Sequence, residues 1–510
     1  MPLLRKPVLM PIVGLDYMNP STMINDRGGF PKNMRLSRND LRKREGKTLF
    51  QTGAMSGAAR VMNLATYPLT SQAIRIIRFS KVGAEKYNSD TGAWDDITGA
   101  AFTGSDDDFF SATVAENKII VTNGVDAIRT HDDDTDFTDL VASSGSVPKT
   151  KFLEYNGGYL LAAYTTKAGE TYPTGIDWTD INDITAWGSG NYGSTLLHHD
   201  PLPIRGLKNL NEYTIAYKKN SIYAGRKVDT SDIFIWDLLY TGIGLMASRA
   251  LVDFRGSHYF MGTDDFYIFN GIKPESIGDQ TVKREVFSRL DGTYQTRSFA
   301  VHVTEMDEVW FFIVTSGNTW PTEIWKYNYR TGYWYFDTCD QITAAIAYYS
   351  AASVSWNSLV GSWNSQTWRW DDKLASAESP IIIFGDSSGN TLKQDTLVNN
   401  DNGSAIDGEW QSMDFVGSDK FENYSRWLQL DFEAKGNSVD IAYSTDYGST
   451  WHTIKTNYTL TSNWPSKMYR IYFDVVARNI RFRLRNNRPG ETFSLRQLYP
   501  FYLQREECNR

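Results

Sequence analysis

A regular alternation of short aromatic strands and polar turns between Thr241 and Ile277 most strongly constrains the fold of this chain. The stretch reads as three strands, separated by a Gly-containing turn and a polar turn, and it closes on Asn270-Gly271. Asn-Gly pairs favour tight turns because both residues tolerate positive φ. Short strands with turns at this spacing are typical of a β-propeller blade, or of a meander built in the same way.

The composition favours sheets throughout the chain. Aromatic residues make up 14% of the 510 residues, and flat rings cover neighbouring strands well. No long segment carries apolar residues at the spacing of an amphipathic helix. A chain of this length exceeds one compact core, so about two or three domains are expected.

Strand-and-turn units recur from residue 56 to residue 350, with Asn123-Gly124 and Asn156-Gly157 as further turn signals. At roughly 40 to 50 residues per blade, this span predicts a β-propeller of about six or seven blades. Residues 351–405 are expected to form a connecting or inserted segment, in which residues 355–372 are rich in Trp, Ser and Asn.

From about residue 406 to residue 510 the pattern becomes cleaner, with period-two alternation in short stretches such as Leu428, Leu430 and Phe432, which predicts an antiparallel β-sandwich. The expected fold is therefore all-β. A propeller-like domain is followed by a C-terminal sandwich, and residues 1–55 form an extended N-terminal arm.

The N-terminal arm is strongly basic, with Asp40 and Glu45 opposing eight basic residues between Arg27 and Lys47. One interpretation is a solvated arm, the usual state of a charge run. The other is a docking arm that contacts an acidic partner, a portal or adaptor protein, or DNA. The candidate contacts are Arg27, Lys32, Arg35, Arg38, Arg42, Lys43 and Arg44.

A second basic feature is the row Arg481, Arg483 and Arg485, which alternates with Ile480, Phe482 and Leu484. Alternate residues on a strand lie about 6.6 Å apart on one face. The row is a candidate subunit or channel contact, through carboxylates of a neighbouring subunit or phosphates. The alternative is a solvated outer face, which is normal for antiparallel sheets.

Residues 444–451 match the Asp-box pattern Ser-x-Asp-x-Gly-x-Thr-Trp, formed here by Ser444, Asp446, Gly448, Thr450 and Trp451. Asp boxes recur in sialidase propellers, which raises a glycosidase hypothesis. Turn chemistry accounts for every residue of the pattern, so a structural turn is the expected role. Four tryptophans of the connecting segment are candidates for an exposed interface or for packing on a sheet: Trp356, Trp363, Trp368 and Trp370.

Other functional classes find little support in the sequence. The net charge of −8 and the pI near 5.4 argue against wrapping of nucleic acid by the outer surface. Cys339 and Cys508 have no metal-ligand spacing, and adjacent His198 and His199 make a poor ligand pair. Phosphate-loop, zinc-protease and serine-hydrolase motifs are missing. We therefore expect no enzyme activity, no cofactor, no metal and no membrane insertion.

The stretch Thr241–Ile277 resembles the tail hub or nozzle proteins of short-tailed bacteriophages, also called packaged-DNA stabilisation proteins. Three further segments are similar to this family in the same order: Asp177–Trp187, Ser221–Tyr223 and Trp325–Trp334. The resemblance covers residues 150–350 well and the sandwich loosely.

This resemblance implies a structural virion protein that forms a homo-oligomeric ring, with six copies expected, below the portal and its adaptor. It also implies contacts with tail fibre or needle proteins and packaged double-stranded DNA held in the lumen. The implied location is the virion tail, after assembly in the host cytoplasm. Two alternatives are a carbohydrate-binding or carbohydrate-cleaving phage tail protein and a propeller scaffold outside viruses.

Overall fold

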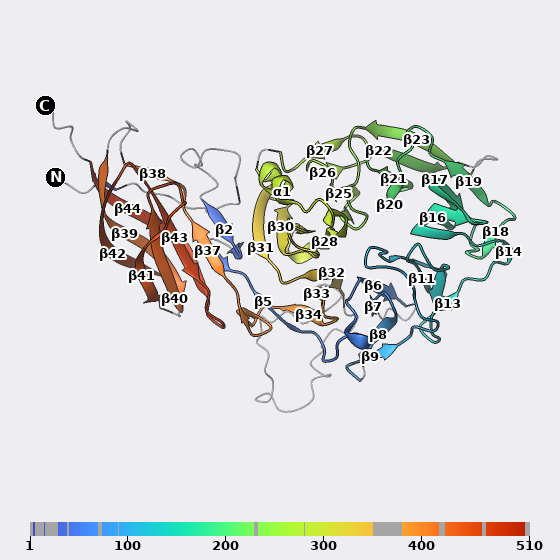
Figure 1. The fold of residues 1–510 in the computed structure, drawn as a ribbon, viewed down its shortest axis with the longest axis horizontal. Coiled ribbons are helices and arrows are strands. Elements are labelled where there is room, and N and C mark those ends of the chain that lie inside the picture. Colours follow the sequence, from blue (N-terminus) through green and yellow to red (C-terminus); the bar gives the residue numbers. More distant parts are fainter. Residues whose placement is uncertain are drawn as a thin grey trace.

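The computed structural model describes residues 4–5, 15, 29–37, 40–69, 74–89, 91–228, 233–279, 281–349, 380–417, 424–461 and 466–504. These residues form an elongated molecule with a ring of sheets at one end and a pair of packed sheets at the other (Figure 1). Strands dominate, and the α-helix α1 (Lys283–Arg289) is short. The expectation of a mostly β fold is confirmed.

Seven four-stranded antiparallel blades surround one axis in the described part of the chain (Figure 1). The first three blades follow in chain order. They comprise β6 (Asn63–Pro68), β7 (Ile74–Phe79), β8 (Ala84–Asn88) and β9 (Ala93–Asp96); then β10 (Ser111–Ala115), β11 (Lys118–Thr122), β12 (Arg129–His131) and β13 (Thr138–Asp139); then β15 (Lys149–Asn156), β16 (Tyr159–Lys167), β17 (Glu170–Trp178) and β19 (Gly193–Leu196).

The next three blades continue around the axis. They comprise β20 (Ile204–Leu210), β21 (Tyr213–Lys218), β22 (Ser221–Lys227) and β23 (Phe234–Thr241); then β24 (Leu251–Phe254), β25 (Ser257–Met261), β26 (Phe266–Phe269) and β27 (Pro274–Ser276); then β28 (Phe299–Val303), β29 (Glu308–Ile313), β30 (Glu323–Asn328) and β31 (Tyr333–Thr338). The stretch 241–277 contains the whole of blade five, from β24 to β27. The propeller expected from this stretch is confirmed.

Blade seven is assembled from two distant parts of the chain. Strands β32 (Ile342–Tyr348), β33 (Ile381–Asp386) and β34 (Thr391–Asp395) are joined by β5 (Gly46–Leu49), which pairs antiparallel with β34. Two short strands, β35 (Asn400–Asp401) and β36 (Ser404–Ala405), extend the sheet beyond β5. Because β32 lies beside β6 of blade one, this blade closes the ring.

Two antiparallel sheets pack face to face at the C-terminal end. The first contains β3 (Met34–Ser37), β4 (Asp40–Lys43), β39 (Ser425–Gly436), β42 (Lys467–Ala477) and β44 (Phe493–Gln504), with β1 (Leu4–Arg5) beside β44. The second contains β37 (Gly408–Gln411), β38 (Phe415–Val416), β40 (Ser438–Ser444), β41 (His452–Thr459) and β43 (Asn479–Asn486). The apolar rows seen in the sequence, such as Leu430 with Phe432 and Phe482 with Leu484, fill the shared core.

One ten-stranded sheet runs from blade six into this sandwich. The connecting strand is β2 (Phe30–Lys32), which pairs parallel to β31 at Lys32–Phe336 and antiparallel to β37 on its other side. Backbone hydrogen bonds therefore bridge the propeller and the sandwich (Figure 1).

The structure differs from the expected organisation at its boundaries. The described part of the basic segment is not an extended arm, because β2 to β5 enter the inter-domain sheet, the sandwich and blade seven. Residues 381–405, expected in a connecting segment, form strands of blade seven instead. The first difference arises because β2, β4 and β5 pair with strands more than 300 residues away, which local patterns do not report. In the second, β33 pairs with β32, a strand close by in the sequence, and with β34. Residues 351–379 lie outside the described residues.

Across the described ranges, no helix is long and apolar enough to cross a bilayer.

Candidate functional site

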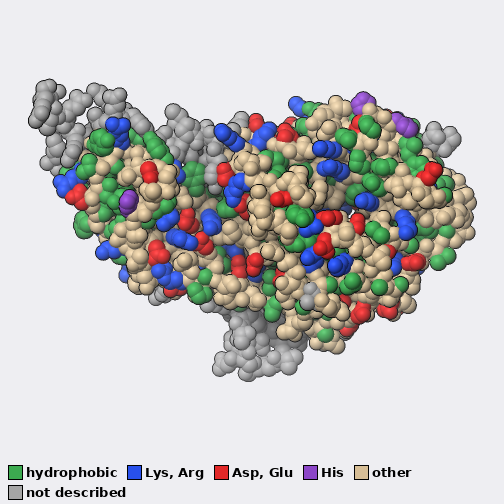
Figure 2. Space-filling view, viewed as in Figure 1, with side chains coloured by type: hydrophobic (Ala, Val, Ile, Leu, Met, Phe, Trp, Pro, Cys, Tyr) green, Lys and Arg blue, Asp and Glu red, His purple; other side chains and the backbone are tan. Residues whose placement is uncertain are grey.

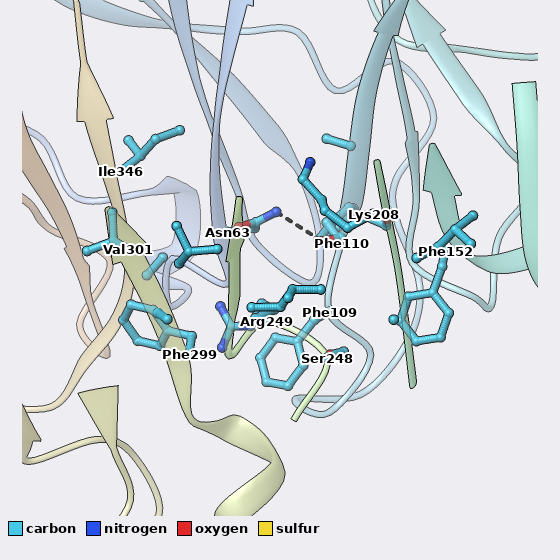
Figure 3. Close-up of a pocket in the computed structure, with 18 of the residues that line it drawn as sticks. Asn63, Phe109, Phe110, Phe152, Lys208, Ser248, Arg249, Phe299, Val301 and Ile346 are labelled. Carbon is cyan, nitrogen blue, oxygen red and sulfur yellow. Dashed lines mark hydrogen bonds between the residues drawn. The ribbon is translucent and has the colours of Figure 1, made fainter. Parts of the chain in front are cut away.

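A cavity of about 520 Å³ lies on the propeller axis. Residues from the innermost strand of every blade, β6, β10, β15, β20, β24, β28 and β32, contribute to its wall. Figure 3 shows aromatic side chains, among them Phe109 and Phe299, close to the basic side chain of Arg249. Volumes of this size are typical of small-molecule sites in proteins.

Arg249, which immediately precedes blade five, reaches across the centre of the ring. Its Nη1 donates hydrogen bonds to the carbonyl oxygens of Met62 at 2.8 Å and Thr343 at 3.0 Å. Its guanidinium carbon lies 3.8 Å from the centroid of the Phe109 ring and 5.1 Å from that of Phe299. Burial lowers the pKa of this guanidinium to about 9.

The opposite end of the cavity holds both signs of charge. Lys208 Nζ lies 3.5 Å from a carboxylate oxygen of Glu154, and Asp253 also lines the wall. Burial raises the pKa of both carboxyl groups, against the opposing effect of Lys208. Burial also lowers the pKa of His302 to about 4, so this ring is neutral at pH 7. This end therefore carries one basic side chain and two carboxyl groups.

A second cavity of about 280 Å³ lies where the innermost strands begin. It shares Phe109, Lys151 and Ser248 with the axial cavity, so the two volumes adjoin. Arg205 from β20 completes its basic side, and Asp107 and Asp108 lie in the facing loop. We call this second cavity the mouth.

The N-terminal basic residues are largely committed to contacts within the chain. Arg44 is buried, and its guanidinium donates to both carboxylate oxygens of Asp401 at 2.9 and 2.5 Å. Burial opposes its charge, but the hydrogen bonds to Asp401 outweigh this and raise its pKa. Lys43 donates to Asn486 at 2.9 Å, and burial lowers its pKa to about 8. Neither residue is available to dock on a partner.

The remaining arm residues are nearer the surface. Lys32 pairs with Asp407 at 2.9 Å, while Arg42 and Arg35 approach Glu45 at 2.6 and 3.7 Å. Arg27 and Arg38 lie outside the described residues. The structure therefore brings this part of the arm together with acidic residues of the same chain.

The arginine row on β43 is also paired internally. Arg481 is buried and makes a two-pronged contact with Asp414, at 3.1 and 2.5 Å. Arg485 lies 2.5 Å from Asp407. Arg483 stacks over Trp451 at 4.5 Å, with a carboxylate oxygen of Glu409 4.0 Å away. The row thus joins the strands of its own sandwich, and Arg485 has the most exposed side chain of the three, at 37%.

The Asp box forms a self-contained turn after β40. Asp446 accepts hydrogen bonds from the backbone N–H of Thr450 at 2.9 Å and from the hydroxyl of Ser444 at 2.7 Å. These bonds, led by that of Ser444, hold the pKa of Asp446 well below its usual value. Gly448 adopts φ +90°, which favours glycine, and its N–H donates to Ser444 Oγ at 2.9 Å. The side chains of Ser444, Asp446 and Thr450 all take part in this turn.

Other sequence candidates contribute no site. The four tryptophans of the connecting segment and Cys508 lie outside the described residues, while Cys339 is buried as a free thiol. Burial raises the pKa of the Cys339 thiol to about 12, which keeps it un-ionised. Within the described ranges, no group of three His, Cys, Asp or Glu side chains is arranged to hold a metal ion.

Sequence reasoning missed three basic residues at the shared end of the two cavities, Lys151, Arg205 and Arg249. They are isolated in sequence, and no motif joins them. The feature that could have identified them is their position, because each lies near the beginning of the innermost strand of its blade. Lys151 is the third residue of β15, Arg205 is the second of β20, and Arg249 lies two residues before β24.

The chain matches no protein-family model and no curated protein. A solved structure that it resembles is the Pan2 WD40 domain of Neurospora crassa, at 9% sequence identity and a TM-score of 0.39. The similarity covers 70% of this chain and 96% of that domain. The strand order and register of the seven blades define the propeller.

Proposed function

We propose that this chain is a structural subunit of a phage tail hub or nozzle. In this proposal, copies form a ring below the portal and adaptor, retain the packaged DNA and provide the channel for its ejection. The observation that carries the proposal is the sheet that continues from blade six through β2 into the sandwich. Because backbone hydrogen bonds join the propeller to the sandwich, the subunit is rigid and elongated. Such a subunit suits a ring that must keep its shape.

The fixed geometry of this joint is reinforced by side chains. Lys32 from β2 pairs with Asp407 at 2.9 Å, and Asn33 donates to Thr338 Oγ1 at 2.9 Å. Arg44 adds a bond to the Thr338 carbonyl at 3.2 Å. Contacts on both sides of β2 oppose hinge motion between propeller and sandwich, which a flexible linker would permit.

In this proposal DNA passes between subunits rather than through a propeller. The axial cavity has a volume of about 520 Å³ and is lined by side chains from all seven blades. Such a volume cannot admit a duplex. A lumen lined by several copies is therefore required, as in any cyclic assembly with a central channel.

The charge of the surface is compatible with DNA that slides. On the face shown in Figure 2, acidic and basic side chains are intermingled over the propeller and the sandwich. The net charge of −8 per chain disfavours tight binding of the phosphate backbone. A weakly interacting lumen would retain DNA by steric closure and would release it readily.

The proposal is tested by the oligomeric state of the full chain. We expect mass photometry and electron microscopy, with the purified connector present, to show closed rings. We also expect particles assembled without this chain to lose their packaged DNA. Monomers alone, together with particles that still retain DNA, would contradict the proposal. Hydrolysis of host-envelope glycans by the purified chain would instead favour a carbohydrate-cleaving tail protein.

A further inference from the structure

Three successive blades each place a basic side chain at the same end of the propeller axis. Lys151 lies on β15 of blade three, Arg205 on β20 of blade four, and Arg249 just before β24 of blade five. Lys151 lines both the axial cavity and the mouth, Arg205 lines the mouth, and Arg249 lines the axial cavity. Together they form one basic wall.

The partners of these cations in the described residues are neutral. Arg205 Nη1 donates to the carbonyl of Met246 at 2.6 Å, and Lys151 Nζ lies 4.9 Å from the centroid of the Tyr164 ring. Arg249 bonds carbonyl oxygens, as described above. Among the described residues, none of the three cations makes an ion pair with a carboxylate.

Within the described residues, neither acidic residue of the mouth makes an ion pair with this wall. An oxygen of Asp107 accepts a hydrogen bond from Arg297 Nε at 2.6 Å. Asp108 accepts from the hydroxyl of Ser105 at 2.7 Å and from its N–H at 2.8 Å. Both carboxylates are therefore held by their own loop or by a neighbouring arginine.

Three cations that make no ion pair within the described residues favour an anion in this partly enclosed cavity. Burial lowers the pKa of both Arg205 and Arg249, because the charged form loses hydration without gaining a counter-charge. An anion bound in this space would attract the cations of the wall, and the attraction would be strong because little water screens it there. Arginine also suits carboxylate and phosphate groups, to which it can donate two parallel hydrogen bonds.

The wall also has an apolar side. Phe109 and Phe152 line both cavities beside Lys151, and the mouth has a volume of about 280 Å³. We propose that the mouth of the propeller binds a small organic anion, whose carboxylate or phosphate group faces Lys151 and Arg205 and whose flat apolar part contacts the phenylalanines. This site does not depend on ring assembly.

The test measures binding of benzoate and phenyl phosphate to the full chain by isothermal titration calorimetry. Benzoate probes a carboxylate, phenyl phosphate probes a phosphate, and benzyl alcohol supplies the same ring without charge. We expect one anion per chain with at least one of the two probes, and no detectable binding of benzyl alcohol. Lys151→Gln and Arg205→Gln should each weaken binding by about tenfold, equivalent to the loss of one charged contact.

Lys149→Gln is the matched control, because Lys149 is on the same strand but its Nζ donates to the Val125 carbonyl outside both cavities. It should leave the affinity unchanged. Both mouth residues are half-buried, and circular dichroism with thermal unfolding identifies any variant that fails to fold. The proposal is overturned if neither anion binds at about 1 mM, a weak-affinity limit. It is also overturned if folded Lys151→Gln and Arg205→Gln bind both anions as the unaltered chain does.

Discussion

The guanidinium carbon of Arg249 lies 3.8 Å from the centroid of the Phe109 ring, so a side chain preceding blade five contacts one preceding blade two. The same guanidinium bonds the carbonyls of Met62 before blade one and Thr343 in blade seven. A weaker contact of 3.4 Å reaches the carbonyl of Arg297 before blade six. One residue therefore links five blades around the axis, and it spans the closure between the first and last blades.

We predict that Arg249→Gln destabilises the propeller by about 3 kcal/mol, since hydrogen bonds from a charged donor contribute about 1.5–3 kcal/mol each. Glutamine retains polarity but cannot reach the carbonyls of Met62 and Thr343 together. Urea unfolding followed by tryptophan fluorescence measures the change. Arg284→Gln, on an exposed position of α1, is the control and should change stability little. Equal losses of unfolding free energy in the two variants would show that the contacts of Arg249 do not hold the blades together.

Closure of blade seven gives a second prediction. A Cβ on Gly46 would lie 2.0 Å from the carbonyl oxygen of Asn400, so Gly46→Ala cannot be accommodated without moving the backbone of β5. We expect a loss of about 3 kcal/mol, at the upper end of overpacking costs. Hydrogen exchange should show lost protection first in β5 and β34. Gly292→Ala is the control, because a Cβ there meets no atom within 4 Å.

The same closure shows what the sequence could and could not predict. Turn signals such as Asn270-Gly271 and Asn123-Gly124 act locally, and the strands on either side of them are present as expected. The pairing of β5 with β34 is not local, because Leu49 faces Leu392. No pattern within either segment specifies such a partner, so the propeller boundary could not be placed.

The burial of the basic segment could not be predicted from the sequence either. A run containing Lys43, Arg44 and Lys47 reads as a solvated charge cluster, since burying charge costs free energy unless partners compensate. The partners exist but are remote, with Asp401 357 residues from Arg44 and Asn486 443 residues from Lys43. The basic wall of the mouth was hidden for a related reason, because its members come from three different blades.

Within the arginine row, we predict unequal roles. Arg481→Gln should destabilise the sandwich by about 3 kcal/mol or more, because it removes two hydrogen bonds from a charged donor to the buried Asp414 carboxylate. Arg485→Gln should cost less than about 1 kcal/mol, since its side chain is 37% exposed and water screens its pairing with Asp407. Urea unfolding of the two variants provides the comparison. Similar losses from both would contradict the roles assigned here.

Acid should destabilise the propeller through His258, which is buried between blades four and five. Its Nδ1 lies 2.8 Å from the Tyr217 hydroxyl, and its Nε2 lies 2.8 Å from the Asn209 carbonyl. The carbonyl can only accept, so Nε2 carries the proton and Nδ1 accepts from the tyrosine. Burial lowers the pKa of His258 from 6.5 to about 4. Between pH 6.5 and about 4, His258 is therefore neutral in the folded state and protonated in the unfolded chain.

This difference makes the folded state less stable as the pH falls below 6.5. Above pH 6.5 both states are neutral and the contribution to stability is complete, whereas between pH 6.5 and about 4 the unfolded chain alone gains the proton. The loss across this window is about 3 kcal/mol, at roughly 1.4 kcal/mol for each pKa unit. We expect His258→Gln to reduce the difference in unfolding free energy between pH 7 and pH 4.5, within the window where the two states differ.

The pKa of His302 is also lowered to about 4, so the stability of that variant still depends on pH to a smaller extent. His199→Gln, at an exposed position, should leave the pH dependence as it is, and an unchanged dependence in His258→Gln would refute the assignment.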